Sequence, residues 1–280
     1  MLDNAAPPRV GRTCQKGANT ITENTSVTIW RERCLLWQEQ DLERALAYFT
    51  FIADVTTLAS HCRFAGDSKT LVARYDGLPF AAIAYHSQGG SAACQDTPRR
   101  IATLTRQLIA PRETFYCLVA EDEMALLQDA YCVLETHPER QMLFRGDTSS
   151  LDAGDATRLT ASDLPAMKAL ARREGMLAFE KDPLAQGPWY GIWRNGQLVA
   201  QGGIHLFLSR AAEIGNIVTT RTRRREGLAR QIVAALLSEL TADRRLVFLQ
   251  AFEDNKPALA FYQHVGFERL RTMYLARCLV

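Results

Sequence analysis

The segment from Glu213 to Leu240, EIGNIVTTRTRRREGLARQIVAALLSEL, constrains the fold more than any other part of this 280-residue chain. Its first part, Glu213 to Thr220, is rich in β-branched residues and predicts a strand. From about Gly227 to Leu240 the apolar residues recur at helical spacing, which predicts a helix with one broad buried face. Arginines stand between the two at positions 221, 223, 224 and 225. The segment therefore predicts a strand, a basic turn and a helix in direct succession.

A strand, basic turn and helix in this order suit a bound polyphosphate. The first N–H groups of a helix have no intrahelical partner, and the helix dipole makes that end positive, so an anion is stabilised there. Gly227 allows a phosphate to approach the backbone closely, and Ala229 adds little bulk. The arginines can pair with phosphate oxygens. A solvated basic turn before an ordinary core helix is the alternative that spacing alone leaves open.

Two motifs in the C-terminal part resemble those of one known family. The segment Arg224 to Ala229, RREGLA, resembles the R/Q-x-x-G-x-G/A signature of the GNAT superfamily of acyl-CoA-dependent N-acyltransferases. Asn255 to Phe267, NKPALAFYQHVGF, resembles the N-x-x-A-x-x-F-Y-x-x-x-G-F segment of the same family. They follow a strand that begins EIGNIV, and the resemblance covers residues 155–280. It implies an N-acetyltransferase with acetyl-CoA as the acyl donor and no metal.

The resemblance also implies where coenzyme A binds. The turn cradles the pyrophosphate, and the backbone of the central strand bonds the pantetheine amides as an added strand would. Asn255 bonds the pantetheine arm in the family, although Asn is also a favoured N-cap residue. The residues expected to bind the coenzyme are Ile217, Val218, Thr219, Arg224, Arg225, Glu226, Gly227, Leu228, Ala229, Arg230, Asn255 and Tyr262.

Acyl transfer from a thioester to an amine sets three demands. The amine must lose a proton, because an alkyl ammonium has a pKa of about 10.4. The carbonyl oxygen needs a donor as charge develops, and the leaving thiolate benefits from a proton. By the resemblance, the amine attacks directly in a ternary complex. Glu213 is the base, directly or through water, a backbone N–H among residues 217–219 stabilises the oxygen, and the Tyr262 hydroxyl faces the sulfur.

Each catalytic candidate has an ordinary structural alternative. Glu213 could be an edge carboxylate paired with an arginine, and Tyr262 could be a core tyrosine. His205, on the preceding strand, is a second candidate base, but a lone strand histidine is more often simply packed. The acceptor-binding loops of the family fall at Glu174, Phe179, Glu180, Trp189 and Tyr190, where packing or surface charge would explain each residue equally well. No motif identifies the amine acceptor or the acyl chain length.

The whole chain reads as an α/β protein in two lobes. Residues 1–25 are a polar, loosely attached tail, residues 26–147 an N-terminal lobe, and residues 155–280 the GNAT domain. The Gly- and Ser-rich segment 146–154 is the linker. In the second lobe, Ser162 should cap a helix that Gly175 ends, and Asn195-Gly196 predicts a hairpin.

The N-terminal lobe is expected to contain a strand over residues 26–36, a helix over 41–59, a hairpin over 70–85, a helix over 98–108, a strand over 115–120, a helix over 123–131 and a strand over 140–144. This order faintly echoes that of the second lobe, as in the two-lobed glycine N-acyltransferase-like members of the superfamily. The lobe would then be a degenerate copy, smaller than the GNAT domain, because Arg99-Arg100 lacks a glycine pair for phosphate. An unrelated packing domain is the alternative.

Composition excludes several other classes of function. With 47% hydrophobic residues, 23% charged residues and a net charge of +2, the chain has no global bias toward nucleic acid or membranes. The first 25 residues lack the apolar centre of a secretory signal. Seven scattered cysteines indicate neither zinc nor a disulfide framework, and favour a reducing, cytoplasmic setting. The expected partners are acyl-CoA and an amine. A non-catalytic acyl-CoA-binding module is the main alternative, and nucleic-acid binding through residues 221–225 is disfavoured because aromatic residues are absent there.

Overall fold

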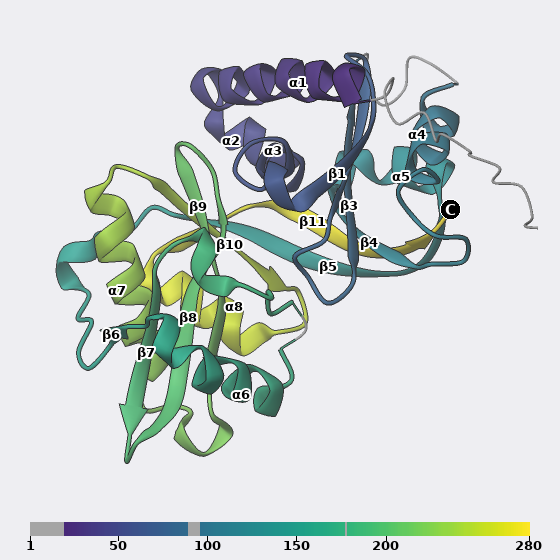
Figure 1. Ribbon diagram of the computed structural model, residues 1–280. Coiled ribbons are helices and arrows are strands. Elements are labelled where there is room, and N and C mark those ends of the chain that lie inside the picture. The colour runs from purple at the N-terminus through teal and green to yellow at the C-terminus, as the bar shows by residue number, and fades with distance from the viewer. Residues whose placement is uncertain (1–19, 89–95, 177) are drawn as a thin grey trace, which may run out of the picture.

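A computed structural model describes residues 20–88, 96–176 and 178–280 of the chain. In these ranges the strands form one 11-stranded mixed sheet in the order β1-β2-β3-β4-β11-β5-β10-β9-β8-β7-β6 (Figure 1). Helices flank it, which confirms the predicted mixed α/β class. The strands are β1 (Cys62–Gly66), β2 (Thr70–Tyr75), β3 (Ala81–Ser87), β4 (Phe115–Ala120), β5 (Cys132–Phe144), β6 (Thr157–Arg158), β7 (Trp189–Arg194), β8 (Gln197–Phe207), β9 (Ala211–Thr219), β10 (Leu246–Phe252) and β11 (Phe267–Leu279).

Helices cover both faces of this sheet. The N-terminal part of the chain contains α1 to α5 and β1 to β5. Here α1 to α3 pack on one face of the sheet over one buried cluster, and α4 and α5 pack on the other face over a second cluster. In the C-terminal part, α7 and α8 share one cluster, and α6 lies over another. The helices are α1 (Thr20–Gln40), α2 (Leu42–Ala45), α3 (Phe49–Val55), α4 (Thr97–Thr105), α5 (Met124–Ala130), α6 (Leu164–Glu174), α7 (Leu228–Ala242) and α8 (Lys256–Val265). No helix in the described ranges is long and apolar enough to cross a membrane.

The prediction of a strand over residues 26–36 was wrong, because this segment lies inside α1. Its buried side chains, Val27, Trp30, Cys34 and Gln38, recur every three or four residues and form one helical face. The β-branched and aromatic residues that favour a strand are here spaced for a helix. Packing against α3 and β1 therefore overrides local propensity.

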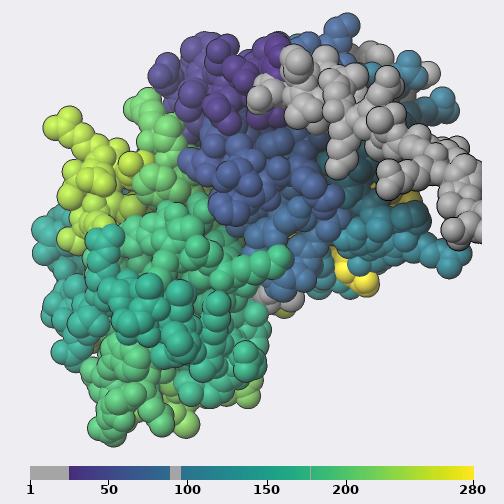
Figure 2. All heavy atoms as spheres, viewed as in Figure 1, coloured from purple at the N-terminus to yellow at the C-terminus, as the bar shows by residue number. Residues whose placement is uncertain are grey.

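The end of the chain joins the two parts of the sheet. β11 pairs with β4 on one side and with β5 on the other, and β5 in turn pairs with β10. β5 is much longer than the strand expected over residues 140–144, because residues 132–138 extend the pairing with β11. Space-filling Figure 2 shows the N-terminal part packed directly against the C-terminal part. The lobe boundaries at 147 and 155 remain predictions, and the lobes they define share one sheet.

The two parts of the chain repeat one order of elements. The hairpin β2–β3 is followed by α4, β4, α5 and β5, just as the hairpin β8–β9 is followed by α7, β10, α8 and β11. The strands that α4 connects, β3 and β4, are parallel and pair only over a short stretch, and so are the strands that α7 connects, β9 and β10. β3 and β4 pair at two positions, and β9 and β10 at three. Each part thus has an opening between two diverging parallel strands.

Most of the turn and helix-end residues predicted from the sequence are found in those roles. Asn195 and Gly196 both have left-handed backbones, with φ of 50° and 73°, as a type I′ hairpin turn requires. Gly175, with φ of 71°, ends α6 as predicted. The cap of this helix was misassigned, since its N-cap is Asp163 and not Ser162; a capping box of Thr160 and Asp163 begins the 3-10 turn Ala161–Asp163 that leads into it.

Candidate functional site

The site begins where β9 and β10 diverge. Their parallel pairing ends at Glu213 and Phe248. Further along β9, Asn216 and Ile217 stand opposite Gly202 alone, which is a β-bulge, and Asn216 has a left-handed backbone with φ of 55°. A bulge bends a strand and increases its twist, so β9 turns away from β10 here. Val218 and Thr219 still pair with β8, but among the described residues no strand pairs with the edge that faces β10. This edge is the stretch expected to receive pantetheine.

The basic turn leads from β9 to an uncapped helix. Arg225 and Gly227 have left-handed backbones, with φ of 68° and 77°, and α7 begins at Leu228 without a side-chain cap. A Cβ built on Gly227 would meet nothing within 4 Å, so the turn is open on that side. The first N–H groups of α7 therefore face a basic, uncapped turn. This is the arrangement that stabilises an anion.

A buried carboxylate lies against the basic turn. The side chain of Glu174, at the end of α6, is only 5% exposed, and its Oε2 lies 3.6 Å from Arg224 Nη2 and 3.9 Å from Arg221 Nε. Arg223 pairs with Glu226 at 3.3 Å. Glu174 was grouped with the acceptor loops in the sequence, and here its nearest cation is Arg173 of the same helix, with Nε 3.5 Å from Oε1, followed by the two arginines of the turn. Its buried Oε2 has no hydrogen-bond partner among the described residues, so it attracts these two arginines by charge alone.

Glu213 and His205, the two candidate bases, are in direct contact. His205 Nδ1 lies 3.1 Å from Glu213 Oε2. The register between β8 and β9 shifts at His205, since Ile204 faces Ile214 but Leu206 faces Glu213. The Glu213 side chain is 4% exposed and that of His205 24%. The bulge therefore turns the imidazole toward the carboxylate.

The His205–Glu213 contact is an ion pair at neutral pH. Desolvation alone would lower the pKa of His205, but the adjacent Glu213 carboxylate, with Glu180 and Glu139, outweighs it and raises that pKa to about 9. The imidazole is then protonated at pH 7 and cannot accept another proton. His205 is therefore not the base at this pH.

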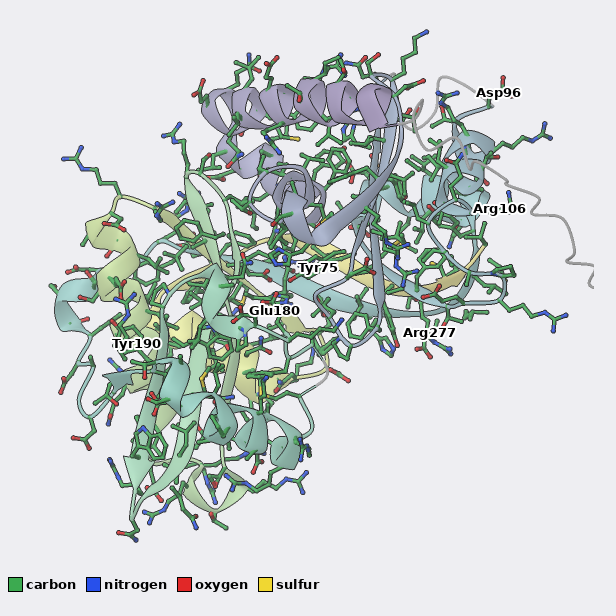
Figure 3. The ribbon with its side chains drawn as sticks, viewed as in Figure 1. Tyr75, Asp96, Arg106, Glu180, Tyr190 and Arg277 are labelled. Carbon is green, nitrogen blue, oxygen red and sulfur yellow. The ribbon has the colours of Figure 1, made fainter. Side chains whose placement is uncertain are left out.

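Further carboxyl groups surround the pair, and the N-terminal part supplies one of them. Glu180, in the loop before β7, and Glu139, on β5, are 3% and 8% exposed. Burial raises the pKa of Glu180 to about 7 and that of Glu139 to about 8. The Tyr75 hydroxyl, on β2, donates to Glu180 Oε1 at 3.4 Å, and Figure 3 shows the two residues side by side where the parts meet. The site is thus built from both parts of the chain.

Comparisons with known proteins agree with this geometry. Residues 157–267 match the model of the Acetyltransferase (GNAT) family. Residues 157–267 form a GNAT domain. A search of curated proteins found no match.

Solved structures extend the likeness in fold beyond the GNAT domain. A GNAT-family protein from Novosphingobium aromaticivorans is 20% identical, with a TM-score of 0.65, and the match covers 84% of this chain and 97% of that one. A tandem GNAT protein from the clavulanic acid biosynthesis pathway is 16% identical, with a TM-score of 0.63 and coverage of 91% and 95%. A GCN5-related N-acetyltransferase from Kribbella flavida is 16% identical, with a TM-score of 0.60 and coverage of 82% and 95%.

The second motif of the GNAT domain, residues 255–267, spans α8 and the start of β11. The Tyr262 ring packs near Phe261 and Phe267, at centroid distances of 5.0 and 5.8 Å. Burial raises the pKa of Tyr262 to about 12, so its hydroxyl stays protonated, and no hydrogen-bond partner for it is found among the described residues. Asn255 caps α8 by accepting from the Ala258 N–H at 3.3 Å. The capping alternative for Asn255 is therefore observed, while its contact with pantetheine remains a prediction.

Three residues expected at the acceptor loops of the GNAT domain have packing contacts instead. Trp189 is buried and donates from Nε1 to the Pro183 carbonyl at 2.7 Å, and Phe179 packs edge-on against it. Tyr190 donates to Glu239 of α7 at 2.7 Å and lies away from Glu180 (Figure 3). Of the five loop residues, Glu180 is the one whose contacts lead to the His205–Glu213 pair.

Tyr75 and Glu139 were missed in the sequence. Each lies on an ordinary strand of the N-terminal part, with no motif around it. Glu139 reaches the GNAT domain through the shared sheet, where β5 pairs with β10. Tyr75 reaches it through the loop before β7, in which Lys181 also bonds the backbone of Asp76 and Gly77. No group of three or more His, Cys, Asp or Glu side chains in the described ranges is arranged to hold a metal ion.

Proposed function

We propose that this chain is an acetyl-CoA-dependent N-acetyltransferase that acts on an amine. The observation that carries the proposal is the His205–Glu213 pair, which lies where β9 and β10 diverge within the GNAT domain. The pair offers a buried carboxyl group, bonded to a protonated imidazole, beside the strand edge on which a thioester would lie. The fold alone would serve a binding module equally well, whereas this pair has the chemistry that amine deprotonation needs.

Coenzyme A is proposed to bind along the diverging edge of β9. Its pyrophosphate would sit at the start of α7, cradled by the backbone of residues 226–229 and flanked by Arg224, Arg225 and Arg230. Its pantetheine amides would bond the backbone of Ile217, Val218 and Thr219, with Asn255 on the other side. The uncapped helix start and the open space at Gly227 support this assignment.

The proposed reaction is a direct attack by the amine on the thioester carbonyl. Glu213 accepts a proton from the amine, and the protonated His205 donates a hydrogen bond to Glu213 and keeps it oriented. A backbone N–H of β9 donates to the carbonyl oxygen as negative charge develops there. The new N–C bond forms as the C–S bond breaks, and the Tyr262 hydroxyl gives its proton to the leaving thiolate.

The amine is proposed to arrive from the seam between the two parts of the chain. Glu180 and Glu139 surround the His205–Glu213 pair there, and Tyr75 orients Glu180. The acidic side chains at this seam favour an acceptor that reaches the site as an ammonium ion, and its excess proton would pass to Glu180, whose pKa of about 7 leaves it partly ionised near neutral pH. The N-terminal part is thereby part of the catalytic site.

Release of free thiol from acetyl-CoA, measured over a panel of amines, tests the proposal. The panel should include alkyl amines, diamines, amino acids, aminoglycosides and a peptide with a free N-terminus. We expect at least one class to release thiol and yield an equal amount of N-acetyl product. Stoichiometric binding of acetyl-CoA with no amine-dependent release would favour the binding module instead.

A further inference from the structure

The turn between β2 and β3, residues 76–80, contacts the loop that precedes β7. The Lys181 N–H donates to the Gly77 carbonyl at 3.1 Å, and Lys181 Nζ donates to the Asp76 carbonyl at 2.7 Å. Glu180, the residue before Lys181, accepts from the hydroxyl of Tyr75, the last residue of β2, at 3.4 Å. Two successive residues of the loop are thus bonded to residues 75–77.

Ion pairs anchor this turn on its other side. The Asp76 carboxylate accepts from Arg63 of β1 at 2.9 and 3.3 Å, and from Arg74 of β2 at 2.8 Å. Arg74 also donates to Glu113, which precedes β4, at 2.9 Å. The Arg74 side chain is only 14% exposed, so its pairs are screened less than those of an exposed side chain. The network therefore limits how far the turn can move.

Gly77 leaves room for the ring of Tyr75. A Cβ built on Gly77 would lie 2.1 Å from both Cζ and the hydroxyl oxygen of Tyr75. This is far inside van der Waals distance, so any side chain at position 77 displaces the end of the ring. Tyr75 is buried in the cluster under α1 to α3, where close packing leaves the ring little freedom. The absence of a side chain at position 77 therefore places the hydroxyl where it reaches Glu180.

The Tyr75 hydroxyl acts on the ionisation of Glu180. Burial raises the pKa of Glu180 to about 7, with smaller contributions from Glu213 and Asp182. His205 and the bond from Tyr75 act in the opposite direction, because a cation or a donor stabilises the charged carboxylate. Burial and the nearby Glu180 carboxyl raise the pKa of Tyr75, so its hydroxyl stays protonated and donates.

We propose that Gly77 is a positioning residue: the bare turn holds the Tyr75 hydroxyl on Glu180 and so sets the pH at which Glu180 can take the proton of the amine. That Glu180 takes this proton rests on the proposed function. The link from Gly77 through Tyr75 to Glu180 does not, because it consists of contacts within the chain. A titration of Glu180 therefore tests the link without any acceptor.

The test follows Glu180 in the full chain by NMR, with glutamate labelled at the side-chain carboxyl carbon and Glu180→Gln to assign the signal. Tyr75→Phe should raise the pKa of Glu180 by about half a pH unit, because one neutral hydrogen bond is lost. Gly77→Ala keeps the hydroxyl but displaces it, and should raise this pKa by a similar amount. The variant with both changes should match Tyr75→Phe alone, because it has no hydroxyl to displace.

Melting temperatures keep the test decisive if the added methyl group disturbs folding. Gly77→Ala should lower the melting temperature in the wild-type background, where the Tyr75 ring fills the space. It should lower it much less in a Tyr75→Leu background, where the shorter side chain leaves room. Gly77 does not have a left-handed backbone, so alanine brings no backbone strain of its own.

Kinetics then connect the link to catalysis. With one acetylated amine, the acidic limb of the pH–rate profile should move to higher pH in Gly77→Ala and in Tyr75→Phe by the same interval. An unchanged Glu180 titration in Gly77→Ala, a double variant that differs from Tyr75→Phe, or equal losses of melting temperature in both backgrounds would overturn the proposal. If the titration shifts as expected and no amine is acetylated, the link stands and the proposed function fails.

Discussion

His205 Nδ1 and Glu213 Oε2 lie 3.1 Å apart, on adjacent strands of the central sheet. The sequence offered these residues as competing bases, and the structure makes them one unit. Because the pair is buried and charged, each residue sets the state of the other. The protonated imidazole holds the carboxylate in one orientation, and the carboxylate keeps the imidazole protonated up to a pH of about 9.

Stability should depend on pH through His205. Its folded-state pKa is raised from 6.5 to about 9, so the pair stabilises the fold fully below pH 6.5, and this contribution is lost as pH rises through about 9. His205→Gln removes the titration. The difference in unfolding free energy between wild type and variant should therefore shrink from pH 6 to pH 9.5, as denaturant unfolding would measure. A difference independent of pH would contradict the ion pair.

Ionisation of the buried Glu139 should lower the free energy of unfolding at alkaline pH. Burial raises its pKa from 4.5 to about 8, so the folded state resists ionisation, and the penalty grows as pH rises above 4.5 and is complete above about 8. Glu139→Gln keeps the shape and removes the charge. Its melting temperature relative to wild type should rise from pH 5 to pH 8.5. Glu268→Gln, an exposed carboxylate on β11, serves as the control and should show no such trend.

Gly227→Val should abolish acetyl-CoA binding while the fold survives. The left-handed backbone at Gly227 makes a β-branched residue costly by about 1–2 kcal/mol, and the side chain would fill the space proposed for phosphate. Gly196→Val is a matched control, because Gly196 also has a left-handed backbone and open space around it but lies in the β7–β8 hairpin. Both variants should lose similar stability, and calorimetry should show binding lost in Gly227→Val alone. Equal affinity in the two would place the phosphates elsewhere.

Tyr262→Phe should lower turnover more than it changes the apparent affinity for acetyl-CoA. The hydroxyl is the proposed proton donor to the thiolate, and loss of a general acid costs on the order of 10²-fold in rate. Because the hydroxyl has no protein partner in the described ranges, the melting temperature should hardly change. Single-turnover rates isolate the chemical step. An unchanged rate there would make Tyr262 a core residue only.

The sequence predicted the GNAT domain well because its signals are local. The basic turn, the Asn-Gly hairpin and the α8 motif each depend on residues close together in the chain, and each was found where expected. The N-terminal part was harder to predict. Helix α1 carried strand-forming residues at helical spacing, and only the tertiary contacts of Trp30 and Cys34 decide between the two.

The composite nature of the site could not be read from the sequence. Glu139 lies near Glu213 because the strand order places β5 beside β10, and Tyr75 reaches Glu180 because the loop before β7 packs on the turn after β2. Such strand order depends on long-range pairing, which leaves no local pattern. The same holds for the contact between His205 and Glu213, which a β-bulge produces.

The most direct test of the proposed mechanism is a pH–rate profile of wild type and Glu213→Gln with one identified amine. The variant keeps the size of the side chain and removes its basic site. It should bind acetyl-CoA normally, lose turnover on the order of 10²-fold near neutral pH, and recover partly at high pH, where more of the amine is already deprotonated. Parallel profiles of similar height would contradict the assignment of Glu213 as the base.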